Sequence, residues 1–453
     1  MRTDKLTWNR KIGFTVGDFG LNLYWQSVSF FLIYFYTDVV GISATTAGII
    51  FMTATVFEAC VDPLAGAFMD RVQTAWGQYR PWLLLGAFPL GAAFALLYWR
   101  PAASGSALVA LLIAIQLFFR LFYTMVAVPF SALTVRLTDS ARERTTLAGL
   151  RMLFAMAAGA AVAYCTQPLA VIFGGGTVRQ GSFPAALAIS AIATITFGIA
   201  FFAASENDSR PAKTPQRAAE YINSVRGNRA FSTLVVGLVF ASASAMTISR
   251  VAVYYFKYVV GQESAVRYAL AISSGAAFLA VPIWIAVGRQ IGKREMWLGA
   301  IGISLLVLII FAATHPSSRL GATFFFASMQ VCNIGISVAY WSMLPDTVEY
   351  GYWKTGIRQE SFLFGLFSFF QKIGLGLSAG VFGWTLDQIG YLPGDHQSPS
   401  TLVGIGYMIV SLCAIGLIGS AVAIYLSPLR RGVHESLVLQ LSGTRLSPVG
   451  KDR

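Results

Sequence analysis

The stretch FPAALAISAIATITFGIAFFAA, residues 183–204, is followed by the polar stretch SENDSRPAKTPQRAAEYINSVRGNRA, residues 205–230, and then by FSTLVVGLVF, residues 231–240. The first stretch is apolar throughout and long enough to cross the hydrocarbon core of a bilayer, which takes about 20 helical residues. The polar stretch is rich in Arg, Ser, Asn and Pro. The three stretches predict two membrane-embedded regions joined by a polar linker.

Apolar runs of the same length recur on both sides of this linker, six between Ile12 and Ala204 and six between Phe231 and Leu426. The 453 residues are 56% hydrophobic and only 12% charged, which is more apolar surface than one soluble core can bury. We therefore predict an all-α membrane protein of twelve transmembrane helices in two six-helix bundles. The expected divisions are an N-terminal bundle (1–204), a cytoplasmic linker (205–230), a C-terminal bundle (231–428) and a cytoplasmic tail (429–453).

The formal net charge of +13 is unevenly distributed. Lys and Arg gather in the tails and in alternate loops, and the positive-inside rule then places both termini in the cytoplasm. This distribution argues against nucleic-acid binding. It predicts a multi-pass protein of the plasma (inner) membrane, surrounded by lipid and expected to be a monomer. The few cations expected at the outer ends are Arg100, Arg179, Lys257, Arg267 and Arg319.

Both halves carry a charged stretch after the fourth apolar run, at 136–145 and at 346–360, which we expect to be inner loops. Matching loops at matching positions indicate a parallel repeat of two bundles, as in the major facilitator fold. Glycines inside the spans, such as Gly376 and Gly380, predict close helix packing.

Glu58 and Asp62 are the most informative residues, because a charge at mid-membrane costs at least about 2.5 kcal/mol. They are four residues apart on one helical face, beside Pro63. Two facing carboxylates repel when both are ionised, so the pair favours uptake of a proton or a small cation. The alternative is a structural ion pair with Arg120, Arg151 or Lys372.

A polar stripe on the first span consists of Asp18, Asn22 and Gln26, at intervals of four. Such a stripe lines water or substrate. Asn22 and Gln26 lie deeper in the span and are the better candidates. Asp18 is near the cytoplasmic end, where pairing with a loop arginine is an equal alternative to binding.

Four cations, Arg120, Arg151, Arg250 and Lys372, fall within predicted spans. Four cations against two deep carboxylates leave a surplus that suits a substrate carboxylate, unless Arg250 snorkels to an interface. The sequence contains no G-x-x-x-x-G-K-[ST] loop, so an ion or substrate gradient must supply the energy. We find no paired nucleophile and base and no metal cluster in the spans, so we expect neither an enzyme nor a metal site. No cofactor beyond a coupling proton or sodium ion is expected.

Several motifs resemble those of the glycoside-pentoside-hexuronide:cation symporter family. They are YFYTDVVG (34–41), EACVDP (58–63), DR at 70–71 with WGQYRPW (76–82), DTVEYG (346–351) and RQES (358–361), with Lys372 twelve residues after Glu360. The resemblance covers nearly the whole chain in the correct order.

That resemblance implies that Asp62 is central to cation coupling and that Glu58 and Thr124 contribute to the cation site, while Arg151 and Lys372 are cavity cations. Val61 replaces an asparagine ligand found in the melibiose permease of that family, so protons are a better expectation than sodium. Asn22, Ala127 and Ser131 replace residues of the galactoside site, and a galactoside is therefore not expected.

These observations together predict a secondary active transporter that couples a monovalent cation to symport of a sugar or glycoside by alternating access. A uronic acid derivative is the narrower expectation. The alternatives are a carrier of lipid-like or other amphipathic molecules and a membrane sugar sensor that does not transport. The predicted coupling residues are Asp62, Glu58 and Thr124, and the predicted substrate-binding residues are Asn22, Gln26, Trp25, Tyr123, Arg120, Arg151, Ser368, Gln371 and Lys372.

Overall fold

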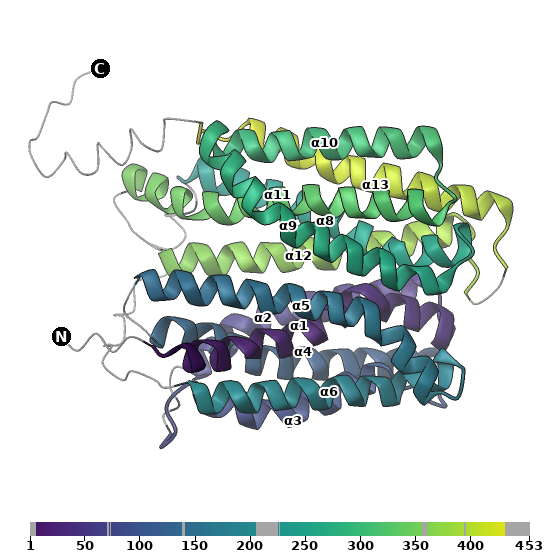
Figure 1. Cartoon of the computed structure of the whole chain (residues 1–453), viewed down its shortest axis with the longest axis horizontal. Coiled ribbons are helices and arrows are strands. Elements are labelled where there is room, and N and C mark those ends of the chain that lie inside the picture. Colours follow the sequence, from purple (N-terminus) through teal and green to yellow (C-terminus); the bar gives the residue numbers. More distant parts are fainter. Residues whose placement is uncertain are drawn as a thin grey trace, which may run out of the picture.

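The computed structural model describes residues 6–69, 72, 74–137, 141–204, 225, 227–355, 360–393 and 396–430. Twelve long α-helices run roughly parallel to one another across the molecule (Figure 1). In the first half they are α1 (Trp8–Tyr34), α2 (Ala44–Met69), α3 (Arg80–Leu97), α4 (Gly105–Arg136), α5 (Ala141–Phe173) and α6 (Val178–Ala203). In the second half they are α8 (Arg229–Tyr254), α9 (Val266–Ile291), α10 (Lys293–Thr314), α11 (Arg319–Thr355), α12 (Glu360–Gln388) and α13 (Pro399–Tyr425).

Short irregular helices extend three of these elements. The segment Phe35–Val40 continues α1 as a π-helix, Tyr255–Val259 continues α8 in the same way, and a 3-10 turn at Glu263–Ala265 precedes α9. Because the number of spans is even, the described chain starts and ends on one side. We call this side the terminal end and the opposite side the distal end.

Eleven of the helices are long and apolar enough to cross a membrane. The helix outside this set is α1, because its polar stripe lowers its hydropathy. It still has the length of a span, and it packs against α5, α6 and α8. Large apolar side chains are exposed on other helices, as expected of surfaces that face lipid; examples are Ile172, Phe202, Leu279 and Ile309.

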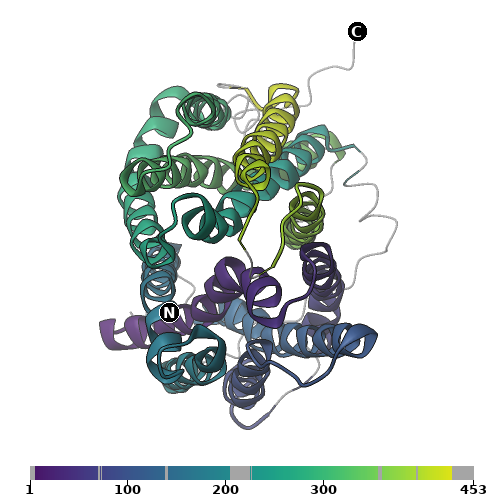
Figure 2. The same cartoon turned by 90° about the vertical axis from the view of Figure 1, so that its right-hand side faces the viewer.

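The contacts group α1 to α6 and α8 to α13 into two bundles, which lie against each other when viewed from the distal end (Figure 2). The bundles meet mainly where α2 packs on α12, α5 on α9 and α1 on α8. The predicted architecture of two six-helix bundles is confirmed. The exact boundaries stay predictions, because most of the 205–230 linker and of the 429–453 tail lies outside the described residues.

Both expected inner loops are wrong in part, because α5 already begins at Ala141 within 136–145 and α11 covers the first part of 346–360. Helix α11 continues through Pro345 as far as Thr355, and Asp346 is therefore a helical residue. Its carboxylate accepts from Lys293 Nζ at 2.8 Å, inside the C-terminal half. An amphipathic helix end carries the same charges as a polar loop, so the sequence does not separate the two.

Candidate functional site

Glu58 and Asp62 project from one face of α2 and share the amine of Lys372, which reaches across from α12. Lys372 Nζ lies 2.7 Å from Glu58 Oε1 and also donates to Asp62 Oδ2. This amine is therefore a polar bridge between two candidate membrane-spanning helices, one from each bundle.

Arg120 on α4 provides a second cation for Glu58. Its Nη1 donates to Glu58 Oε2 at 2.7 Å, its Nη2 reaches the hydroxyl of Thr55 at 3.4 Å, and both charged side chains are 0% exposed. The guanidinium also lies over aromatic rings, 5.1 Å from the centroid of Phe51 and 5.7 Å from that of Trp25. Glu58 is thus fully desolvated and has two cationic partners.

Asp62 has a different environment. Thr124 Oγ1 on α4 donates to Asp62 Oδ1 at 2.6 Å, and the Asp62 side chain is 24% exposed. The side chain of the neighbouring Val61 offers no oxygen. Asp62 is therefore the less buried carboxylate of the pair.

Close approach of α2 and α12 makes the Lys372 bridge possible. A Cβ atom on Gly48 would lie 2.5 Å from the carbonyl oxygen of Ala379, and one on Gly380 would lie 3.0 Å from Met52 Sδ. Larger residues at these positions would separate the helices. The small residues thus let two backbones meet, as in other membrane helix pairs.

Arg151 is not part of this cluster. It lies on α5, donates through Nε to Asp18, and donates from Nη1 to Thr134 Oγ1 at 2.7 Å. Asn22 Nδ2 donates to the Asp18 carbonyl at 2.9 Å. Asp18 is therefore in an ion pair, but its partner Arg151 belongs to helix α5 and not to a loop as expected. The binding role of Asp18 stays a prediction.

The other predicted substrate residues make contacts of their own. The Trp25 and Tyr123 rings lie 6.2 Å apart, and Gln26 lies close to Gly159 on α5. On α12, Ser368 Oγ donates to its own helix at the Phe364 carbonyl. Gln371 Nε2 donates to Tyr340 Oη at 3.3 Å. The substrate-binding roles of all these residues stay predictions.

Arg250 was expected either in the cavity or near an interface, and the second alternative is wrong. Its side chain on α8 is buried, with Nη1 2.7 Å from Ser378 Oγ and the guanidinium 4.6 Å from the Phe51 centroid. None of its contacts among the described residues is with a carboxylate. Arg250 is therefore a buried cation without a countercharge in that part of the chain.

A cluster at the distal end was missed by the sequence analysis. Asp38, which is 1% exposed, accepts from Lys257 Nζ at 2.6 Å and also from the Tyr258 and Tyr391 hydroxyls. Burial raises the pKa of the Tyr391 hydroxyl, which favours its protonated, donating form. We call these four residues the distal cluster, and they join α1 to the second bundle.

Two further polar contacts lie near the distal cluster. Tyr34 Oη donates to Glu263 at 2.8 Å. The Asp387 carboxylate at the end of α12 accepts from the N–H groups of Ala44 at 3.1 Å and Thr45 at 2.8 Å, where the N-terminus of α2 favours negative charge. Polar contacts thus close the distal end between the bundles. YFYTDVVG contains Asp38, but its partners in the second bundle lie more than 200 residues away in sequence.

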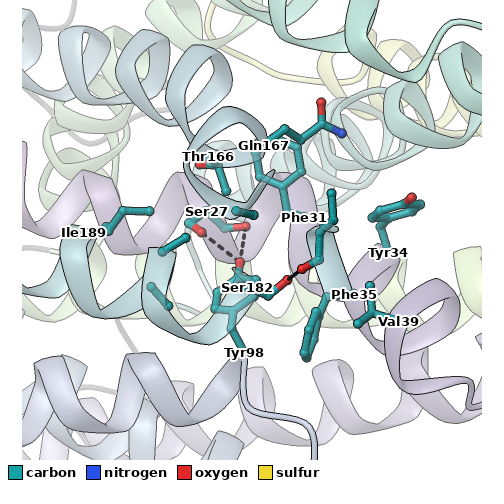
Figure 3. A pocket seen from close by; sticks show the side chains of 14 residues that line it. Ser27, Phe31, Tyr34, Phe35, Val39, Tyr98, Thr166, Gln167, Ser182 and Ile189 are labelled. Atoms are coloured by element: carbon teal, nitrogen blue, oxygen red, sulfur yellow. Dashed lines mark hydrogen bonds between the residues drawn. The ribbon is translucent and has the colours of Figure 1, made fainter. Parts of the chain in front are cut away.

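A cavity of about 40 Å³ lies apart from the carboxylates, among α1, α3, α5 and α6 (Figure 3). Its lining is mostly apolar, and its hydroxyls partly satisfy each other, since Ser27 and Tyr98 lie 2.8 Å apart. At roughly 10–15 Å³ per enclosed water, it has room for a few waters and not for a sugar.

Paired bundles with buried charges at their interface define a membrane transporter and not an enzyme. The chain belongs to the family described as MFS/sugar transport protein, whose model matches residues 13–431.

Curated relatives agree over nearly the full length. The putative glycoside/cation symporter YagG of Escherichia coli (strain K12) is 28% identical, over 87% of this chain and 86% of its own. The isoprimeverose transporter of Lactiplantibacillus pentosus is 28% identical, over 92% of this chain and 88% of its own. A solved structure of a bacterial homologue of the human lysosomal transporter Spinster, in an inward-facing and unoccupied conformation, is also similar. The TM-score is 0.68 at 11% sequence identity, and the match covers 96% of this chain and 98% of that chain. That likeness concerns the fold alone.

Proposed function

We propose that this transporter couples the movement of a proton to symport of a sugar or glycoside by alternating access, with a monomer as the functional unit. The observation that carries the proposal is the Lys372 bridge from α12 to both carboxylates of α2. The names of the relatives, a glycoside/cation symporter and an isoprimeverose transporter, support the substrate class.

Asp62 is the proposed coupling group, because it is the more exposed carboxylate and belongs to the interface between the bundles. Protonation removes its charge and weakens one of the two bonds of Lys372. The bundles are then less strongly joined at this point, which favours their rearrangement. Coupling is reciprocal, so substrate binding must in turn favour protonation.

The positive-inside pattern supports a cytoplasmic terminal end and an outward distal end. In this orientation the distal cluster closes the outer side, and the structure corresponds to a state closed to the outside. Release of the Asp38 contacts would then be required for substrate entry.

A carboxylate-bearing sugar such as a uronic acid derivative is the narrower proposal. Its support is the buried guanidinium of Arg250, which has no carboxylate partner among the described residues. An unpaired buried cation is costly, and an anionic substrate would offset this cost in a state that opens the interface.

Counterflow in proteoliposomes tests the substrate class. A panel of neutral and acidic labelled sugars is tested at two pH values, with and without sodium, using protein-free vesicles as the control. We expect counterflow of at least one sugar, and a preference for acidic sugars would support the narrower proposal. Absence of counterflow for every sugar, with correctly inserted protein, would contradict the proposed function.

A further inference from the structure

From the contacts of Arg120 we infer that this guanidinium is a tethered cation that fills the cation-binding position beside Glu58, so that removing it creates a sodium site. The inference deepens the proposed function and rests on it, because it names the residue that sets the choice of coupling ion.

The first step of the argument is the number of free oxygens. Glu58 Oε2 accepts from Arg120 and Glu58 Oε1 from Lys372, each at 2.7 Å. On Asp62, Oδ1 accepts from Thr124 and Oδ2 from Lys372. All four carboxylate oxygens therefore have a donor. Sodium, a hard cation, needs several oxygen ligands, and the residues present do not fit it.

Charge leads to the same conclusion. Two carboxylates and two cations, Arg120 and Lys372, sum to zero, so the cluster has no net charge that would hold a sodium ion. Lys372 lies on the opposite bundle and is 19% exposed, so it can leave the carboxylates when the bundles move apart. Arg120 lies on α4, in the same bundle as Glu58, and therefore stays beside it.

The surroundings of Arg120 explain why it is retained in place. Its guanidinium is 0% exposed, it contacts the Thr55 hydroxyl, and it lies over the Phe51, Trp25 and Phe119 rings. Arginine is suited to such sites, because its planar group stacks on rings while donating to a carboxylate. A neutral side chain would leave Glu58 Oε2 without its donor, on the same helix as the Thr55 hydroxyl that Arg120 also contacts.

Binding of radioactive sodium to the purified full chain in nanodiscs tests the inference, with choline replacing unlabelled sodium to keep ionic strength constant. Wild type is expected to retain only background sodium, whereas Arg120→Ala is expected to bind sodium saturably, at least tenfold above background. Arg120→Lys, which keeps the charge, should remain at background.

Two control variants separate the site from a general loss of buried charge. The double variant Arg120→Ala with Glu58→Gln should bind no sodium, because the carboxylate is lost. Arg250→Ala removes a buried guanidinium that also contacts Phe51 but no described carboxylate, and it should remain at background as well.

Sodium binding by wild type, or background binding by folded Arg120→Ala, would overturn the inference. If Arg120→Ala does not fold, Arg120→Gln keeps more of the volume and removes the charge, and the same two criteria apply. Wild-type binding is measured in either case. Sodium binding by the variant together with no sugar counterflow by wild type would support the inference and contradict only the proposed function.

Discussion

Replacing Asp38 by Asn should open the distal end. The carboxylate accepts from Lys257 across the bundle interface at 2.6 Å, and from the Tyr258 and Tyr391 hydroxyls. An asparagine keeps an acceptor of similar shape but loses the charge, so Lys257 remains without its ionic partner.

The size of the effect follows from these contacts. A hydrogen bond to a charged group contributes about 1.5–3 kcal/mol, and each 1.4 kcal/mol is about a tenfold change in an equilibrium constant. Since Lys257 is 23% exposed, water compensates part of the loss. We expect the equilibrium to shift toward the distal-open state by roughly tenfold to a hundredfold.

Distances between spin labels measure this shift. Suitable label positions are Ala102, before α4, and Ser317, before α11, which are exposed at the distal end of different bundles. Cysteines introduced there can carry the labels once the exposed native cysteines, Cys60 and Cys165, are replaced. The Asp38→Asn variant should add a longer-distance population. Asp346→Asn, which removes a carboxylate bonded to Lys293 within one bundle, is the matched control. Identical distance distributions in Asp38→Asn and wild type would refute the reasoning.

Two further variants test other contacts. Arg151→Ala should lower the stability of the folded protein by about 3 kcal/mol, because it leaves the nearly buried Asp18 carboxylate unpaired. Adding Asp18→Asn should recover most of this loss in a thermal melt. No recovery would argue against the ion pair. Gly383→Val should favour the distal-open state in the same spin-label measurement, because even a Cβ at this position would clash with the Ala44 carbonyl. An unchanged distance distribution would contradict this and show that α12 can adjust.

The sequence predicted the helices and the central carboxylates because both depend on local rules. Apolar length defines a span, and a spacing of four places Glu58 and Asp62 on one face. It also identified the cations available to this pair, but it could not choose among them. Arg120 and Arg151 each lie within a span of the first half, and only the packing of α4 on α2 and of α5 on α1 decides which of them meets Glu58.

Contacts between distant segments escaped prediction for the same reason. Asp38 belongs to a recognised motif, yet its distant partners come from the π-helix after α8 and from the connection after α12. The burial of Arg250 was equally unpredictable, because its contacts Ser378 and Phe51 come from α12 and α2, far away in sequence.

The central claim, that Asp62 couples a cation gradient to sugar movement, is tested most directly by accumulation of a counterflow-active sugar in proteoliposomes under an imposed pH gradient. Wild type should accumulate the sugar above the external concentration, and Asp62→Asn should equilibrate it without accumulation while retaining counterflow. Uphill accumulation by Asp62→Asn equal to that of wild type would contradict the account.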